Sequence, residues 1–202
     1  MAEIEGFILA GGASSRMGED KALLRLGGEP FVGRAARALG GVAGRVRVVS
    51  SRHEAAALGL EVLPDLYGGR GALGGIHAAL AACDAPWAAV LSCDLPFVTG
   101  ELLARLASFR ASVTDAVAPT QEDGRPQPLC AFYARDPCLR MTEDLIRTGE
   151  LRPRALLRQV RTRWVGFEEL EDLDGSGLFF RNVNTPEDYR RALDEAKPGE
   201  VW

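Results

Sequence analysis

The sequence predicts an α/β protein built on a mostly parallel sheet with helices on both faces. Short apolar runs alternate along the chain with helical patterns, and glycine-rich or polar segments follow several of those runs directly. Alternation of this kind is typical of strand–helix–strand units. The length of 202 residues suits a single domain, 1–202, with one substantial core.

The strands are predicted from short apolar runs that end at small or polar residues. The first, Ile4–Leu9, ends at a glycine-rich segment. The run Trp87–Ser92 is followed by C-D-L-P, where Pro96 prevents the strand from continuing. The other expected strands, in chain order, are Arg45–Ser50, Glu61–Leu63, Ala116–Ala118, Leu129–Tyr133 and Thr162–Val165.

Helices are predicted where apolar residues recur at helical spacing between those runs. Pro30–Leu39 begins with proline and ends at two glycines, and Pro186–Ala196 has Thr185 as its N-cap. The remaining expected helices are Gly75–Cys83, Glu101–Phe109 and Arg152–Val160.

Composition and charge exclude several classes of protein. The net charge of −4, without a long basic run, argues against binding to nucleic acid. No apolar stretch approaches the roughly 20 residues needed to cross a membrane, and the N-terminus lacks the basic region of a secretion signal. The four cysteines form no C-x-x-C pair, which argues against a zinc site. We expect buried, reduced thiols in a cytoplasmic protein.

The segment after the first strand, L-A-G-G-A-S-S-R-M-G-E-D-K, is the strongest indication of a ligand site. Gly11 and Gly12 let main-chain N–H groups approach a ligand closely, and Arg16 and Lys21 add two cations. This combination suits a polyphosphate. The spacing matches neither a P-loop nor the dinucleotide-binding G-x-G-x-x-G. Taken alone, the segment is equally consistent with a flexible surface turn.

Three further polar segments follow predicted strands: Ser50–Arg52, Asp65 and Asp94. The carboxyl ends of parallel strands line the ligand crevice of an open α/β sheet. A carboxylate at Asp94 suits Mg²⁺, which prefers oxygen ligands, although turn aspartates are also common. Four such placements on one edge favour a ligand site over unrelated turns.

Two other segments suit flat, hydrogen-bonding ligands. Gly68–Gly75 holds five glycines beside Asp65, which gives its backbone freedom to contact a base or a ribose. Asn182 and Asn184 alternate around Val183, so both amides can project to one side and bind a heterocycle. Either asparagine can instead order a turn or cap the final helix.

With these motifs in view, the chain resembles the molybdenum cofactor guanylyltransferase family. The resemblance covers nearly the whole chain and is carried, in order, by L-A-G-G-x-S-x-R-M-G-x-D-K, P-D-x-x-x-G-x-G-x-L-x-G, S-C-D-L-P-F, R-P-Q-P-L and N-V-N-T-P-E-D. It implies a three-layer α/β/α Rossmann-like nucleotidyltransferase fold. It also implies transfer of GMP from GTP to the terminal phosphate of molybdopterin, with Mg²⁺, giving molybdopterin guanine dinucleotide and pyrophosphate.

The resemblance implies roles for residues that match the motifs. The nucleotide-binding set is Leu9, Ala10, Gly11, Gly12, Lys21, Asp65 and Asp94. The catalytic set is Arg16, Lys21 and Asp94, with Asp94 as the metal ligand. The set expected near the pterin half of the substrate is Arg125, Gln127, Asn182 and Asn184. Molybdenum cofactor chaperones or acceptor molybdoenzymes are the implied protein partners.

Two positions depart from the family pattern, and more than one function stays open. Ala72 stands where proline is common, and Ser51 where family members can have asparagine, which leaves a nucleotide contact there open. Molybdopterin cytidylyltransferases are the near alternative, but their first loop more often lacks the second glycine, here Gly12. A non-catalytic GTP-binding adaptor for molybdoenzyme maturation and a sugar-1-phosphate nucleotidyltransferase are also compatible with parts of the pattern.

Overall fold

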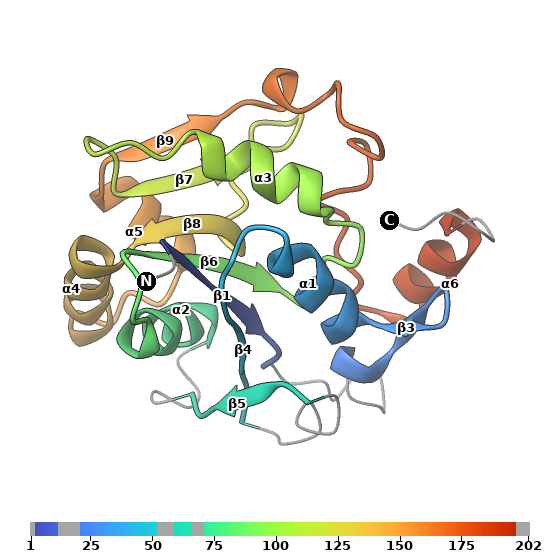
Figure 1. Ribbon diagram of the computed structural model, residues 1–202, viewed down its shortest axis with the longest axis horizontal. Coiled ribbons are helices and arrows are strands. Elements are labelled where there is room, and N and C mark those ends of the chain that lie inside the picture. Colours follow the sequence, from blue (N-terminus) through green and yellow to red (C-terminus); the bar gives the residue numbers. More distant parts are fainter. Residues whose placement is uncertain (1–2, 12–20, 52–58, 66–70, 197–202) are drawn as a thin grey trace.

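A seven-stranded sheet forms the centre of the protein, with helices on both faces (Figure 1). The computed structural model describes residues 3–11, 21–51, 59–65 and 71–196. The strand order is β5-β4-β1-β6-β8-β7-β9. The strands are β1 (Ile4–Leu9), β4 (Val46–Val49), β5 (Glu61–Leu63), β6 (Trp87–Ser92), β7 (Ala116–Pro119), β8 (Cys130–Ala134) and β9 (Thr162–Val165). Only β8 runs antiparallel to its neighbours in this sheet, so the predicted mostly parallel α/β fold is confirmed.

Helices cover the sheet in two layers, and the side chains of β1 alternate between them. Ile4 and Ile8 pack with residues of α1 and α3, whereas Phe7 and Leu9 pack with residues of α2, α4 and α5. Every residue of β1 is buried, as expected for a central parallel strand. The helices are α1 (Phe31–Gly40), α2 (Gly71–Ala82), α3 (Gly100–Ser108), α4 (Arg135–Arg147), α5 (Pro153–Gln159) and α6 (Pro186–Glu195).

The structure corrects one helix boundary and adds one helix. Helix α2 begins at Gly71, whereas the sequence predicted a start at Gly75. Glycine allows α2 to lie close to β1, because a Cβ on Gly75 would stand 3.3 Å from a methyl group of Leu9. Helix α4 was not predicted, since its buried residues, Cys138, Thr142 and Ile146, form only a narrow stripe.

A small antiparallel hairpin was also not predicted. It consists of β2 (Arg25–Leu26) and β3 (Glu29–Pro30), joined by Gly27 and Gly28 with φ of 60° and 84°. Positive φ at both central positions is what a tight two-residue hairpin turn requires. A short 3-10 helix, η2 (Lys21–Leu23), directly precedes the hairpin, and a second, η4 (Phe167–Glu169), follows β9.

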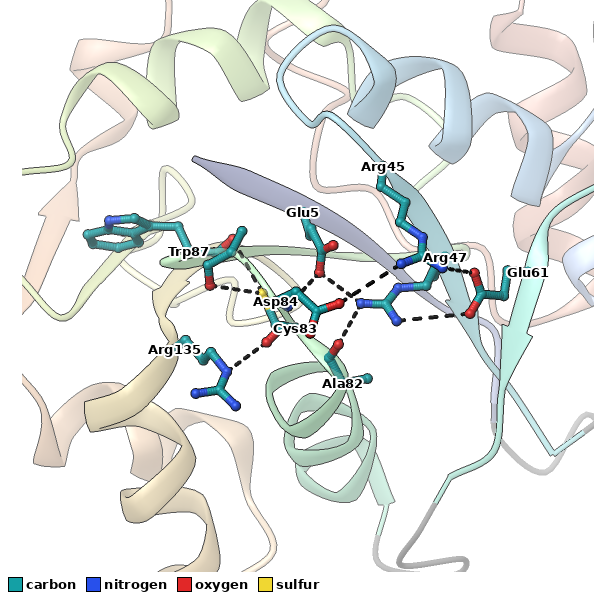
Figure 2. A network of polar contacts seen from close by, with 10 residues as sticks. Glu5, Arg45, Arg47, Glu61, Ala82, Cys83, Asp84, Trp87 and Arg135 are labelled. Atoms are coloured by element: carbon teal, nitrogen blue, oxygen red, sulfur yellow. Dashed lines mark hydrogen bonds and ion pairs between the residues drawn. The ribbon is translucent and has the colours of Figure 1, made fainter. Parts of the chain in front are cut away.

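A buried polar network fixes the end of α2 at the amino ends of the strands (Figure 2). Arg47 on β4 and Glu5 on β1 form an ion pair of 2.7 Å, and their side chains are only 6% and 9% exposed. Arg47 also donates to the carbonyl of Ala82, the last residue of α2, at 2.6 Å. Glu5 accepts from the N–H of Asp84 at 2.9 Å. These contacts hold the last turn of α2 against the amino ends of β1 and β4, at the edge of the sheet opposite the carboxyl ends of the strands.

All four cysteines are buried, as predicted. Burial raises the pKa of the Cys83, Cys130 and Cys138 thiols to about 12, which makes them inert at neutral pH. Within the described ranges, none of the helices has the length and apolar character needed to traverse a bilayer.

Candidate active site

The carboxyl ends of four parallel strands lie side by side at one edge of the sheet. The register pairs Leu63 with Val49, Val49 with Leu9, and Leu9 with Ser92. The last residues of β5, β4, β1 and β6 therefore form one row. Helix α1, which follows β1, and helix α2, which precedes β6, cover opposite faces of the sheet. The strand order therefore changes direction between β1 and β6. Such a point is where open α/β sheets bind ligands.

The chain leaves β1 along this row. The N–H of Ala10 donates to the carbonyl of Val49 at 3.0 Å, and the Ser50 hydroxyl donates to the carbonyl of Ala10 at 3.0 Å. Leu9 and Ala10 are buried, whereas Gly11 is exposed with open space where a Cβ would stand. The main chain at Gly11 is thus accessible to a ligand. Gly12 and Arg16, two further expected site residues, lie outside the described residues.

Asp65 and Asp94 follow two other strands of the row. Asp65 is half-buried two residues beyond the end of β5. Asp94 is half-buried on the turn after β6, where the N–H of Cys93 donates to the carbonyl of Leu9 at 3.2 Å. The Asp94 Oδ1 atom is fully buried and accepts no hydrogen bond from any described residue.

The orphaned oxygen of Asp94 fits a metal ligand. A buried carboxylate oxygen without a donor is costly, and in native proteins such an atom calls for an ion, water or ligand. Oxygen is also the ligand type that Mg²⁺ prefers. No group of three or more metal-binding side chains occurs within the described part of the chain. Mg²⁺ at this position would therefore take most of its ligands from water and phosphate, as it commonly does.

Lys21 and Asn184 meet beside Asp94, although they lie far apart in the sequence. The Lys21 Nζ atom donates to the Asn184 Oδ1 atom at 2.7 Å. The residue before Asn184, Val183, donates its N–H to the carbonyl of Asp94 at 2.9 Å. The structure therefore brings together one expected residue from each of three segments.

A capping box at the start of α6 positions Asn184. The Asp188 carboxylate accepts from the N–H groups of Asn184 at 3.1 Å and Thr185 at 2.9 Å. In return, the Thr185 hydroxyl accepts from the N–H of Asp188 at 3.1 Å. The hydrogen bond with Thr185, followed by those from the backbone, holds the pKa of Asp188 below its ordinary value. The sequence predicted the Thr185 cap; the role of Asp188 was not predicted, although N-T-P-E-D carries this signal.

The two asparagines flank a buried residue, as their spacing suggested. Asn182 and Asn184 are exposed, and Val183 between them is fully buried. Val183 packs in a small third core with Leu24 and Phe97. Burial of Val183 therefore fixes the segment that carries both amides against the turns that follow Lys21 and Asp94.

Gln127 lies at the same edge of the sheet, but Arg125 is held elsewhere. Gln127 is buried, and its N–H donates to the carbonyl of Pro119, the last residue of β7, at 2.9 Å. Arg125 is exposed, and its guanidinium pairs with Asp123 in the same loop. Among the described residues, no hydrogen bond or ion pair joins Arg125 to Lys21, Asp94 or Asn184. The structure therefore does not bring Arg125 into contact with these three residues, and its expected role near the pterin half stays a prediction.

A groove of about 390 Å³ lies beside the loop between β7 and β8. It is lined by Gln121, Glu122, Asp123, Phe167, Ser176, Gly177, Phe180 and Arg181. Arg181 directly precedes Asn182, and Gln121 follows the carboxyl end of β7. The groove thus adjoins the segment that carries the two asparagines.

Comparison with known proteins identifies the family to which the chain is similar. A family model described as a MobA-like NTP transferase domain matches residues 6–164. A probable molybdenum cofactor guanylyltransferase from Pelotomaculum thermopropionicum is 38% identical, covering 100% of this chain and 99% of the relative. A molybdenum cofactor guanylyltransferase from Desulfosudis oleivorans is 29% identical and covers 100% of both chains.

Solved structures show the same architecture. Molybdopterin-guanine dinucleotide biosynthesis protein A from Archaeoglobus fulgidus superposes with a TM-score of 0.79 at 27% identity, covering 95% of this chain and 97% of that one. A 2-C-methyl-D-erythritol 4-phosphate cytidylyltransferase from Thermus thermophilus has a TM-score of 0.67 at 18% identity, covering 94% and 97%, and shows the shared fold alone. The chain therefore belongs to the MobA-like NTP transferase family, and its resemblance to the molybdenum cofactor guanylyltransferases is confirmed.

Proposed function

We propose that this protein transfers GMP from GTP to the terminal phosphate of molybdopterin, forming molybdopterin guanine dinucleotide and pyrophosphate. The observation that carries the proposal is the meeting of Lys21, Asp94 and Asn184 at the carboxyl ends of β1 and β6. The names of the relatives, molybdenum cofactor guanylyltransferases, support GTP as the nucleotide and molybdopterin as the acceptor.

The reaction needs charge neutralisation more than it needs a base. An oxygen of the molybdopterin phosphate attacks the α-phosphorus of GTP, and the bond from that phosphorus to the bridging oxygen of the departing pyrophosphate breaks. The attacking phosphate is already an anion, so no side chain has to remove a proton from it. Positioning of the reacting groups and stabilisation of the phosphate charge are then the main sources of rate enhancement.

Lys21 and Asp94 suit this task in two different ways, Lys21 as a cation and Asp94 as a ligand for a metal ion. The Lys21 ammonium has three donor hydrogens, one of which goes to Asn184, so others are available for phosphate oxygens. Asp94, with its buried Oδ1, would hold Mg²⁺. Bound there, Mg²⁺ would neutralise phosphate charge and act as a Lewis acid. Gly11 and the segment after it, including Arg16, would supply further donors to the triphosphate.

The second substrate would lie on the side of the asparagines. Asn182 and Asn184 expose amide groups that both donate and accept hydrogen bonds, as an aminopyrimidinone ring requires. The adjoining groove provides space and two aromatic side chains, Phe167 and Phe180. We assign the pterin half of molybdopterin to this side, with Gln127 and Arg125 on the neighbouring loop.

We place the reaction in the cytoplasm, with acceptor molybdoenzymes or molybdenum cofactor chaperones as recipients of the product. The buried thiols with raised pKa are consistent with a reducing compartment, because none of them needs an oxidised partner to complete the core.

The proposal is tested by a nucleotide panel. Protein, Mg²⁺ and molybdopterin are mixed with GTP, CTP or ATP labelled at the α-phosphate, and the labelled dinucleotide and the released pyrophosphate are quantified. We expect equal amounts of both products with GTP and much less with the other nucleotides. Preferred use of CTP would identify a cytidylyltransferase, and GTP binding without pyrophosphate release would identify an adaptor.

A further inference from the structure

One buried arginine connects the two turns that carry Lys21 and Asp94. Arg34 lies on α1, on the face that packs against the sheet, and only 6% of the residue is exposed. Its Nε atom donates to the carbonyl of Pro96 at 2.9 Å. Its Nη1 atom donates to the carbonyl of Leu26 at 3.3 Å and lies 3.9 Å from a carboxylate oxygen of Glu29.

Both carbonyls belong to segments that directly follow residues of the candidate site in the chain. Pro96 is on the turn after β6, two residues beyond Asp94. Leu26 is in β2, which η2 precedes, and η2 begins at Lys21. Arg34 therefore touches neither Lys21 nor Asp94 but binds the main chain close to each of them.

Contacts on the exposed side close a ring around the site. Lys21 bonds to Asn184, the neighbouring Val183 bonds to the Asp94 carbonyl, and Arg34 joins the two remaining ends of this chain of contacts. The Lys21–Asn184 contact faces solvent, where a substrate can replace it. Arg34 is the buried connection, which a substrate cannot reach.

The chemistry of the guanidinium explains why arginine fits here. A planar guanidinium presents several donors in a fixed arrangement, so it can bind two carbonyls at once, whereas a lysine ammonium is a single point of charge. Burial lowers the pKa of Arg34 from its ordinary value, and Glu29 acts in the opposite direction. Arginine keeps its proton in such surroundings, so the connection persists at every pH at which the protein is folded.

We propose that Arg34 is a positioning residue for nucleotidyl transfer, which sets the distance between the Lys21 ammonium and the Asp94 carboxylate by holding the carbonyls of Leu26 and Pro96. This inference rests on the proposed function, because it assigns those two groups to the triphosphate. It concerns the alignment of the reacting groups rather than the affinity for either substrate. Arg34 variants should therefore lose kcat with little change in KM for GTP.

The test compares Arg34→Met and Arg34→Lys with Arg47→Lys. Arg47 is a matched control: it is 5% exposed, it also binds a main-chain carbonyl, and it lies at the opposite edge of the sheet. We expect Arg34→Met to lower kcat by about 10- to 100-fold, as misplacement by about 1 Å does. Arg34→Lys, which can retain one carbonyl, should lose less. Arg47→Lys should lower the Tm and leave kcat unchanged.

Hydrogen exchange provides a second measurement that does not depend on activity. The N–H groups of Leu24, Leu95 and Val98 form hydrogen bonds within the two turns, and the N–H of Val183 donates to the carbonyl of Asp94. We expect these amides to exchange faster in folded Arg34→Lys protein, while amides of the distant helix α4 keep their wild-type rates. Wild-type exchange at all four amides, or wild-type kcat in either Arg34 variant, would overturn the inference. So would an equal loss of kcat in Arg47→Lys.

The outcomes separate this inference from the proposed function. If wild-type protein transfers no GMP to molybdopterin, the proposed function fails. In that case the exchange of the four amides still decides whether Arg34 holds the two turns together.

Discussion

At the residue scale, a few side chains that are distant in the sequence share one short path of contacts. Lys21 donates a hydrogen bond to Asn184, and the preceding residue, Val183, donates to the carbonyl of Asp94. Lys21 and Asn184 were expected on different substrates, the triphosphate and the pterin. In our proposal, their direct hydrogen bond marks where the two substrates meet.

This contact predicts that Lys21 and Asn184 are energetically coupled in catalysis. Lys21→Ala should lower kcat/KM for GTP by the equivalent of about 1.5–3 kcal/mol, because a charge-assisted contact to phosphate is lost. Asn184→Ala should lower it less. Kinetics of the two single variants and the double variant give the interaction energy, which we expect at about 0.5–3 kcal/mol. Additive effects would show that the pair does not act together on the substrate.

The sequence alone indicated the types of residue at the site but not this contact. Glycines, cations and carboxylates that follow predicted strands were enough to place Lys21, Asp65 and Asp94 at one edge of a sheet. The Lys21–Asn184 contact joins residues 163 positions apart and depends on the burial of Val183. No local pattern encodes such a pairing. Likewise, the motif that contains Arg125 does not indicate that its guanidinium pairs with Asp123 in the same loop.

At the scale of single elements, α2 connects the two edges of the sheet. Its last residue is held by Arg47, and its first residues lie near the row of strand ends. Close packing of Gly75 against Leu9 leaves little freedom for the helix to shift. The buried pair of Arg47 and Glu5 therefore fixes the end of α2 that is remote from the site.

We predict that Arg47→Met alone destabilises the protein strongly. It leaves the Glu5 carboxylate buried without its partner, which typically costs about 3–5 kcal/mol in the free energy of unfolding. The double variant Glu5→Gln/Arg47→Met should be considerably more stable than Arg47→Met, because no buried charge remains unpaired. Urea unfolding of the three proteins measures this. Equal stability of the single and double variants would mean that Glu5 is solvated rather than buried with Arg47.

The elements that the sequence failed to predict have weak local patterns. Helix α4 buries only every fourth residue along one line, including a threonine, and it has a proline in its first turn. Helix α4 packs against α2, and tertiary packing of this kind supplies most of the stability of a helix in a protein. The hairpin of β2 and β3 has two residues in each strand, too few for the alternation by which strands are recognised. Its Gly27-Gly28 turn was the available signal.

At the scale of the whole molecule, the two halves of the sheet support different parts of the candidate site. The parallel strands β5, β4, β1 and β6 supply the row of ends that faces the nucleotide in our proposal. The strands β8, β7 and β9 support the loop with Gln127 and the groove beside it. The segment before α6 lies against both halves of the sheet. For this reason the last sequence motif of the chain lies close to earlier ones.

An ion pair joins the residues that directly precede β7 and β9 in the outer half of the sheet. Asp115 accepts from the Arg161 side chain at 2.7 and 2.9 Å and from its N–H at 3.0 Å. The hydrogen bonds from the Arg161 side chain hold the pKa of Asp115 below its ordinary value. The stabilisation is therefore fully present above the pKa of the unfolded chain, about 3.9, and is lost as the pH falls through the lower pKa of the folded state.

The lowered pKa of Asp115 predicts how the stability of Asp115→Asn depends on pH. At pH 7 the variant should be less stable than the wild type, and the difference in free energy of unfolding should shrink below about pH 4. Urea unfolding between pH 7 and pH 3 measures it. A difference that stays constant over this range would show that the ion pair does not titrate with folding.

The central claim is that Asp94 and Lys21 act on one triphosphate in transfer of GMP to molybdopterin. Single-turnover mixing of excess protein with α-labelled GTP, Mg²⁺ and molybdopterin tests it most directly, with wild-type protein beside Asp94→Asn. We predict that the wild type converts the label to dinucleotide, and that folded Asp94→Asn does so about 10²–10³ times more slowly, as loss of a key charge-stabilising group does. Equal rates in the two proteins would contradict it.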